Sequence, residues 1–306
     1  MNSKKTIKIF RRLLADRYVY LMLLPVVVYY LLFRYWPMAW LSVSFYDYRL
    51  LRGFAGSTFV GFKNYIDFFN GMDFVRILRN TLMLNLYQLT FVFVSPIIFA
   101  LLLNEIKFLK YKKVVQTISY LPYFISTVVL VTAITTFLSP SVGVLNGILK
   151  SMGRETIYFL GQPGYFRPVF IISAIWQMTG WSAVIYLSAF TTIDPVLYEA
   201  AIADGAGRFK QLWHITLPGI LTAIVIQFLI QIGNILNVSF EKAFLLQNNL
   251  NLSVSEVLST YVYKQGIVFS NISFGTTVGM FNSVVSLILV LCANALSKKV
   301  TEISLW

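Results

Sequence analysis

The amino-acid sequence predicts an all-α, polytopic membrane protein with about six transmembrane helices, and three observations support that fold class. The chain is 58% hydrophobic and only 12% charged, about half the charged fraction of an ordinary soluble domain. Its mean hydropathy is +0.72. Uncharged stretches long enough to cross a bilayer recur along the chain. They are continuous rather than alternating, which argues against a transmembrane β-barrel.

The length of each apolar run sets the expected number of spans. A membrane-spanning helix needs roughly 20 apolar residues, because each adds about 1.5 Å across a core about 30 Å thick. We therefore expect one membrane domain over residues 1–306, with spans near 18–40, 80–104, 116–138, 169–190, 215–238 and 277–297. The first run lacks a following small-residue cleavage site, which predicts a retained anchor rather than a cleaved signal.

The position of the basic residues indicates which loops face the cytoplasm. The formal net charge is +13, and 14 of the 25 Lys and Arg residues lie in four segments, 1–17, 104–113, 191–214 and 298–306. Short loops rich in Lys and Arg stay on the cytoplasmic side, so we expect both termini there. Membrane lipid head groups explain basic residues beside apolar spans, whereas no basic aromatic platform accompanies the charge. Nucleic-acid binding is therefore not expected.

The chain has few residues suited to catalysis or to binding a coupling ion, which argues against several functions. All twelve acidic residues lie outside the expected spans, which argues against a carrier that binds a coupling ion within the membrane. One His, one Cys and no close carboxylate pair provide little for a membrane enzyme. No glycine is followed by lysine, so the G-x-x-x-x-G-K-[ST] phosphate loop is absent. We expect no metal, no catalytic residues and no cofactor in this chain, and any ATP would be hydrolysed on another polypeptide.

The segment 191–214, between the fourth and fifth spans, is predicted to form a compact helix–turn–helix. Asp194 is suited to cap a helix whose first residue is Pro195. Three alanines in that helix keep it narrow, and Gly205 then permits a sharp reversal. Such a narrow helix is expected to enter a groove on a partner protein at the cytoplasmic membrane face.

This segment resembles the EAA loop of permease subunits in ATP-binding-cassette importers. That motif reads E-A-A, three residues, G, nine residues, I, one residue, L-P, and it matches here at Glu199, Ala200, Ala201, Gly205, Ile215, Leu217 and Pro218. Asp204 before the glycine is the form usual in carbohydrate-type permeases. Residues 35–37, 44–47, 61–65 and 80–82 are similar to maltose-permease-like subunits. The run 120–126 looks closest to the subgroup that handles complex oligo- and polysaccharides.

The resemblance implies a type I importer permease and a set of partners. These are a second homologous permease, two ATPase subunits that carry ATP and Mg and dock on the EAA loops, and an extracytoplasmic sugar-binding protein. The substrate would be an oligosaccharide or polysaccharide fragment, and the location a bacterial cytoplasmic membrane. An ion-coupled carrier and a membrane enzyme or scaffold are the alternatives that the residues argue against.

A polar stripe in the fifth span is the candidate substrate path. Three carboxamides recur there at i, i+4 and i+7, which places them on one helical face, and neighbouring spans offer aromatic faces for pyranose rings. The candidate path residues are Gln227, Gln231, Asn234, Trp176, Trp181 and Tyr123, and the fourth span also offers Gln177 and Tyr186. The alternative is that these polar groups hold helices together, and the sequence leaves both interpretations open.

Overall fold

The computed structural model describes residues 16–305 of the chain. Four helices are long and apolar enough to cross a membrane: Arg17–Phe45, Phe74–Asn104, Pro163–Phe190 and Ile272–Thr301. Two helix pairs meet the same standard but are bent, by 96° in Leu109–Phe124 with Thr127–Phe137 and by 57° in Arg208–Gly219 with Leu221–Gly233. Counting each pair as one span gives six, which confirms the predicted all-α membrane fold. The basic segment predicted ahead of the first span lies almost wholly outside the described residues.

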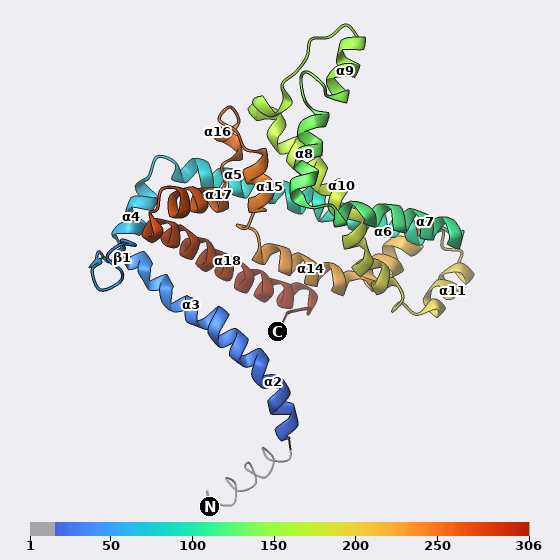
Figure 1. Cartoon of the computed structure of the whole chain (residues 1–306). Helices are drawn as coiled ribbons and strands as arrows, with labels where there is room; N and C mark the ends of the chain where they lie inside the picture. The colour runs from blue at the N-terminus through green and yellow to red at the C-terminus, as the bar shows by residue number, and fades with distance from the viewer. Residues whose placement is uncertain (1–15, 306) are drawn as a thin grey trace, which may run out of the picture.

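The first span reaches away from the rest of the chain as a single arm (Figure 1). It consists of α2 (Arg17–Tyr30), η1 (Leu31–Tyr35), α3 (Trp36–Met38) and η2 (Ala39–Phe45). No residue between 17 and 42 is buried, and η2 makes the main contacts between the arm and the described body. There Tyr65 of α4 (Lys63–Asn70) donates its hydroxyl hydrogen to Ser44 at 2.9 Å. A short antiparallel pair, β1 (Tyr46–Asp47) and β2 (Thr58–Phe59), follows.

Helix α10 (Pro163–Phe190) lies at the centre of the helix packing. It packs along the second span, which is α5 (Phe74–Tyr87), η3 (Gln88–Val92) and α6 (Val94–Asn104). The hydroxyls of Ser95 and Thr179 are hydrogen-bonded across that contact at 2.8 Å. Gly180 lets α10 approach α7 (Leu109–Tyr120) closely, because a Cβ atom there would clash with the carbonyl of Ser119.

The third span is broken, whereas the sequence predicted one run over 116–138. Helix α7 continues into η4 (Leu121–Phe124), the chain becomes extended at Ile125, and α8 (Thr127–Phe137) then leaves at a steep angle. Ser126 begins α8 by accepting a hydrogen bond from the amide of Val129. The free carbonyl of Ile125 accepts a hydrogen bond from Gln177 at 3.0 Å. Such pairing is required in an apolar surrounding, where an unsatisfied backbone group is expensive.

The fifth span is also bent, and its helix ends before the predicted boundary at 238. Its first part consists of α12 (Arg208–Gln211), η6 (Leu212–Thr216) and α13 (Leu217–Gly219). Pro218 and the non-helical Ile220 separate these turns from α14 (Leu221–Gly233). Beyond Gly233 the backbone leaves the helix, so residues 234–238 belong to the connection that follows.

The connections carry short helices that pack onto the spans. They are α9 (Val144–Ser151), η5 (Phe159–Gly161), α11 (Pro195–Ala203), α15 (Phe240–Leu246), α16 (Leu252–Ser255), α17 (Leu258–Tyr263) and η7 (Lys264–Val268), ahead of the last span α18 (Ile272–Thr301). Glu256, only 4% exposed, ties this region to α5 by an ion pair with Arg76 at 2.6 Å, and it also pairs with Lys264 of η7 at 2.8 Å. Helix α11 and strand β1 lie at opposite ends of the helical body (Figure 1).

Replacing Gly180 by alanine should separate α10 from α7. The added methyl group has no space beside Ser119, so we expect the free energy of unfolding to fall by about 1–3 kcal/mol. The matched control is Gly164→Ala in the same helix, where nothing lies within 4 Å of the added atom. Thermal unfolding of the purified complex measures both variants. Equal stability of the two would contradict the close packing.

Candidate functional site

A cavity of about 700 Å³, lined by both polar and apolar side chains, opens between the membrane-crossing helices. Its walls come from η3, α6, η4, α10, α14 and α15, so segments far apart in sequence meet there. The residues that line it include six with carboxamide or phenol groups, Gln88, Tyr123, Gln177, Tyr186, Gln227 and Gln231. The bend after η4 borders this space, because Ile125, Ser126 and Thr127 are among its lining residues. The cavity therefore depends on the break in the third span.

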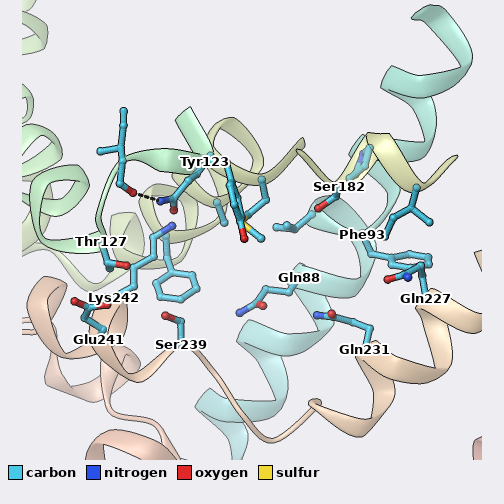
Figure 2. A pocket seen from close by; sticks show the side chains of 18 of the residues that line it. Gln88, Phe93, Tyr123, Thr127, Ser182, Gln227, Gln231, Ser239, Glu241 and Lys242 are labelled. Carbon is cyan, nitrogen blue, oxygen red and sulfur yellow. Dashed lines mark hydrogen bonds between the residues drawn. The ribbon is translucent and has the colours of Figure 1, made fainter. Parts of the chain in front are cut away.

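Three of the carboxamides have unused hydrogen-bonding groups. Gln227 and Gln231 lie one turn apart on α14, and Gln88 faces them from η3 (Figure 2). Within residues 16–305 none of these three side chains forms a hydrogen bond. Each amide has two donor hydrogens and an accepting oxygen. The arrangement is suited to a ligand rich in hydroxyl groups, which needs both donors and acceptors.

Three of the six predicted path residues line the cavity, and the other three do not. Gln227, Gln231 and Tyr123 line the cavity. Trp181 lies behind Tyr123, with ring centroids 4.6 Å apart and planes 7° from parallel, so it holds the tyrosine ring in place. Trp176 is 53% exposed and is not among the lining residues. Asn234 follows the end of α14 and donates to the carbonyl of Ile230 at 3.1 Å. It is not among the residues that line the cavity with Gln227 and Gln231.

Sequence reasoning did not predict the contribution of α15 to the cavity. Ser239, Glu241 and Lys242 line one side of the cavity, although they belong to a connection between spans (Figure 2). Lys242 is only 4% exposed, and its amine has no hydrogen-bond partner within residues 16–305. Its nitrogen lies 4.9 Å from the ring centroid of Phe170. Burial lowers the pKa of Lys242 from 10.5 to about 7, because the charged amine is deprived of water.

The second candidate site is the loop between α10 and α14, at the opposite end of the body from β1. Its local structure matches the prediction: Asp194 caps α11 by accepting from the amide of Val196 at 2.9 Å, and Pro195 is the first helical residue. Gly205 has φ +73°, a left-handed conformation that favours glycine. The hydroxyls of Tyr198 and Thr216, 2.9 Å apart, join the two halves of the loop.

This loop exposes its motif residues and several large apolar side chains. Glu199, Ala200, Asp204, Gly205 and Pro218 are exposed, while Ala201, Ile215 and Leu217 are half-buried. No residue of α11 is buried within the described chain. The large apolar side chains left open to the surroundings are Val196, Leu197, Ile202, Phe209 and Trp213. A concentration of exposed apolar side chains of this kind marks a surface for contact with another macromolecule.

The depressed pKa of Lys242 predicts a pH-dependent stability. Between pH 7 and pH 10 the unfolded chain binds a proton at this lysine that the folded chain lacks, so stability rises with pH in that window. Lys242→Met removes this contribution. We expect the variant to unfold at a higher temperature than the wild type at pH 7, with the difference shrinking toward pH 10. Thermal scans at three pH values measure it, and parallel curves for the two proteins would contradict the burial of an unpaired amine.

Comparison with known proteins relates this architecture to one family. Residues 96–302 match the family model described as binding-protein-dependent transport system inner membrane component. Protein LplB of Bacillus subtilis (strain 168) is 43% identical over 98% of this chain and 94% of its own. The polygalacturonan/rhamnogalacturonan transport system permease protein YteP of the same organism is likewise 43% identical, with the same coverage.

Solved structures agree with the sequence relatives. A chain of the bacterial alginate ABC transporter, in complex with an alginate pentasaccharide-bound periplasmic protein, superposes with a TM-score of 0.90. It is 39% identical, and the match covers 97% of this chain and 99% of that one. The family model covers more than half of the chain, and the relatives match it almost end to end. The chain therefore belongs to the family of binding-protein-dependent transport system inner membrane components.

Proposed function

We propose that this chain is the permease subunit of an ATP-driven importer and forms half of the path for an oligosaccharide or polysaccharide fragment. The observation that carries the proposal is the cavity between membrane-crossing helices in which three carboxamides have no hydrogen-bond partner among residues 16–305. Sugar hydroxyls need donors and acceptors together, and a pyranose ring packs on an aromatic face such as Tyr123. The relatives support the same substrate class, since YteP is named for polygalacturonan and rhamnogalacturonan and the solved transporter imports alginate.

The energy for import would come from partner chains. We infer that α11 and the turn at Gly205 dock in a groove on an ATPase subunit, which holds ATP and Mg. The complete match to the EAA pattern and the exposed apolar side chains of the loop support this assignment. It places α11 and both termini on the cytoplasmic side, as the distribution of Lys and Arg also favours.

Further partners complete the importer. A second homologous permease would supply the other half of the path, with two ATPase subunits below the pair. An extracytoplasmic binding protein would deliver the sugar, as the periplasmic protein accompanies the alginate transporter. The first span supports an assembly of this kind, because residues 17–42 expose their apolar side chains to lipid or to another subunit.

Gln231→Leu tests the path assignment. We expect sugar uptake by the reconstituted importer to fall several-fold, because a membrane-buried amide bond contributes about 0.6–2 kcal/mol, while the complex stays intact. Asn234→Leu is the control, since Asn234 is exposed and bonded to its own helix. If the amides only join subunits, the purified Gln231→Leu complex will lose subunits. Normal uptake by an intact complex in the Gln227→Leu, Gln231→Leu double variant would contradict both roles.

Gly205→Val tests the coupling loop. A side chain in the left-handed conformation costs about 1–2 kcal/mol, and a β-branched residue fits it poorly, so the turn should shift. We expect uptake and sugar-stimulated ATP hydrolysis to fall several-fold, with membrane insertion retained. Gly207→Val is the matched control, because Gly207 has φ −67° and free space around it. Equal activity in the two variants would refute the dependence of coupling on this turn.

A further inference from the structure

Lys242 is a buried lysine on the wall of the cavity, and its amine has no hydrogen-bond partner among the described residues. Its helix, α15, is fixed by the buried side chains of Ala243 and Leu246, which belong to the same apolar cluster as Phe170. The lysine therefore has a defined position on the cavity wall, with its amine shielded from solvent beside the Phe170 ring. A single cation–aromatic contact replaces little of the water that a buried ammonium group loses.

The charged groups near this amine leave it unpaired. Among the described residues that line the cavity, Lys242 is the only cation and Glu241 the only carboxylate. Glu241 is exposed and forms no ion pair with its neighbour within residues 16–305. A buried charge without a partner is rare, because its desolvation is not offset. No described residue therefore offsets the charge of this amine when it is protonated.

We propose that Lys242 binds a carboxylate of the transported sugar, so that the substrate is an acidic oligosaccharide containing uronate residues. This inference rests on the proposed function and narrows its substrate class. The uncharged carboxamides of Gln88, Gln227 and Gln231 would bind hydroxyl groups on the other side of the cavity. A carboxylate that enters beside α15 accepts a charge-assisted hydrogen bond from the amine, which is about twice as strong as a neutral one.

Glu241 offers a competing explanation for the lysine. Glu241 and Lys242 are consecutive residues of α15, so a change of side-chain rotamer, rather than a movement of the helix, would have to bring the carboxylate to the amine. The pair would then be a structural contact rather than a ligand site. The two explanations differ in their response to ligand charge. Only a ligand site distinguishes a sugar acid from its uncharged methyl ester.

The experiment compares two probes on the assembled importer with its binding protein. One probe is a trigalacturonate and the other is the same trisaccharide with its carboxylates methyl-esterified. Uptake into proteoliposomes gives an acid-to-ester ratio for the wild type and for Lys242→Met, Lys242→Gln and Lys242→Arg. We expect the ratio to fall about tenfold in the Met and Gln variants and to be largely retained in Lys242→Arg, because loss of a charge-assisted bond amounts to roughly one decade in affinity. Gln227→Leu is the control, since it should lower uptake of both probes in the same proportion.

Each other result overturns the proposal. An unchanged ratio in the Met and Gln variants would exclude a carboxylate subsite at Lys242, and an equal loss of both probes would favour the contact with Glu241. Assembly of Lys242→Arg alone among the three variants would show that the charge is structural. A wild-type importer that takes up neutral oligosaccharides but not trigalacturonate would refute the acidic substrate and leave the proposed function standing. A wild type that takes up no glycan at all would refute the proposed function itself.

Discussion

The requirement that backbone polar groups be paired away from water determines how this chain is built. In an apolar surrounding a helix satisfies its own N–H and C=O groups, so a break in a helix needs substitute partners. At the break between η4 and α8 the substitutes are side chains: Gln177 donates to the carbonyl of Ile125, and Ser126 accepts from the first turn of α8. The break in turn creates room for the cavity. A membrane bundle of straight helices would pack its walls together and leave no such space.

Two buried charged residues of this structure, Glu256 and Lys242, differ in whether they have an ion-pair partner. Glu256 is buried but fully paired, with Arg76 and Lys264 on either side of it, and the network fixes α17 on α5. Lys242 is buried to a similar extent but has no partner in the described chain. A paired buried charge confers structural specificity, whereas an unpaired one raises the free energy of the protein without a bound ligand. This contrast within one molecule is what makes Lys242 a candidate for ligand binding and Glu256 a structural residue.

The sequence predicts the number and approximate positions of the spans because length and apolarity determine what can cross a bilayer. It places the second helix at 80, although the helix begins at Phe74, because helical hydrogen bonding continues through Arg76 and Arg79, beyond the apolar stretch. The bend after Phe124 is not predicted, since a run of uncharged residues does not indicate where a helix changes direction. The local signals for it are the Leu121-Pro122 pair and Ser126, which caps α8.

The candidate site is predictable only where helical periodicity holds. Gln227 and Gln231 share a face as expected, but Asn234 lies past Gly233, where the helix has ended and the period no longer applies. Tyr123 and Trp181 are brought together by packing between η4 and α10 that no local pattern reports. Lys242 is the hardest to foresee, because its burial depends on how α15 inserts between α8 and α10. A charged residue in a connecting segment is ordinarily a solvated one.

The exposed first span has a consequence for how the protein is made. Residues 17–42 contribute nothing to the buried interior of the described chain, so the remaining helices have their own core without it. The arm is joined to that core mainly through η2, around Ser44 and Tyr65. This helix leaves the ribosome before the other described spans, and its own apolarity is sufficient to drive its insertion. The described chain then leaves its apolar side chains uncovered, so their final surroundings are lipid or another polypeptide.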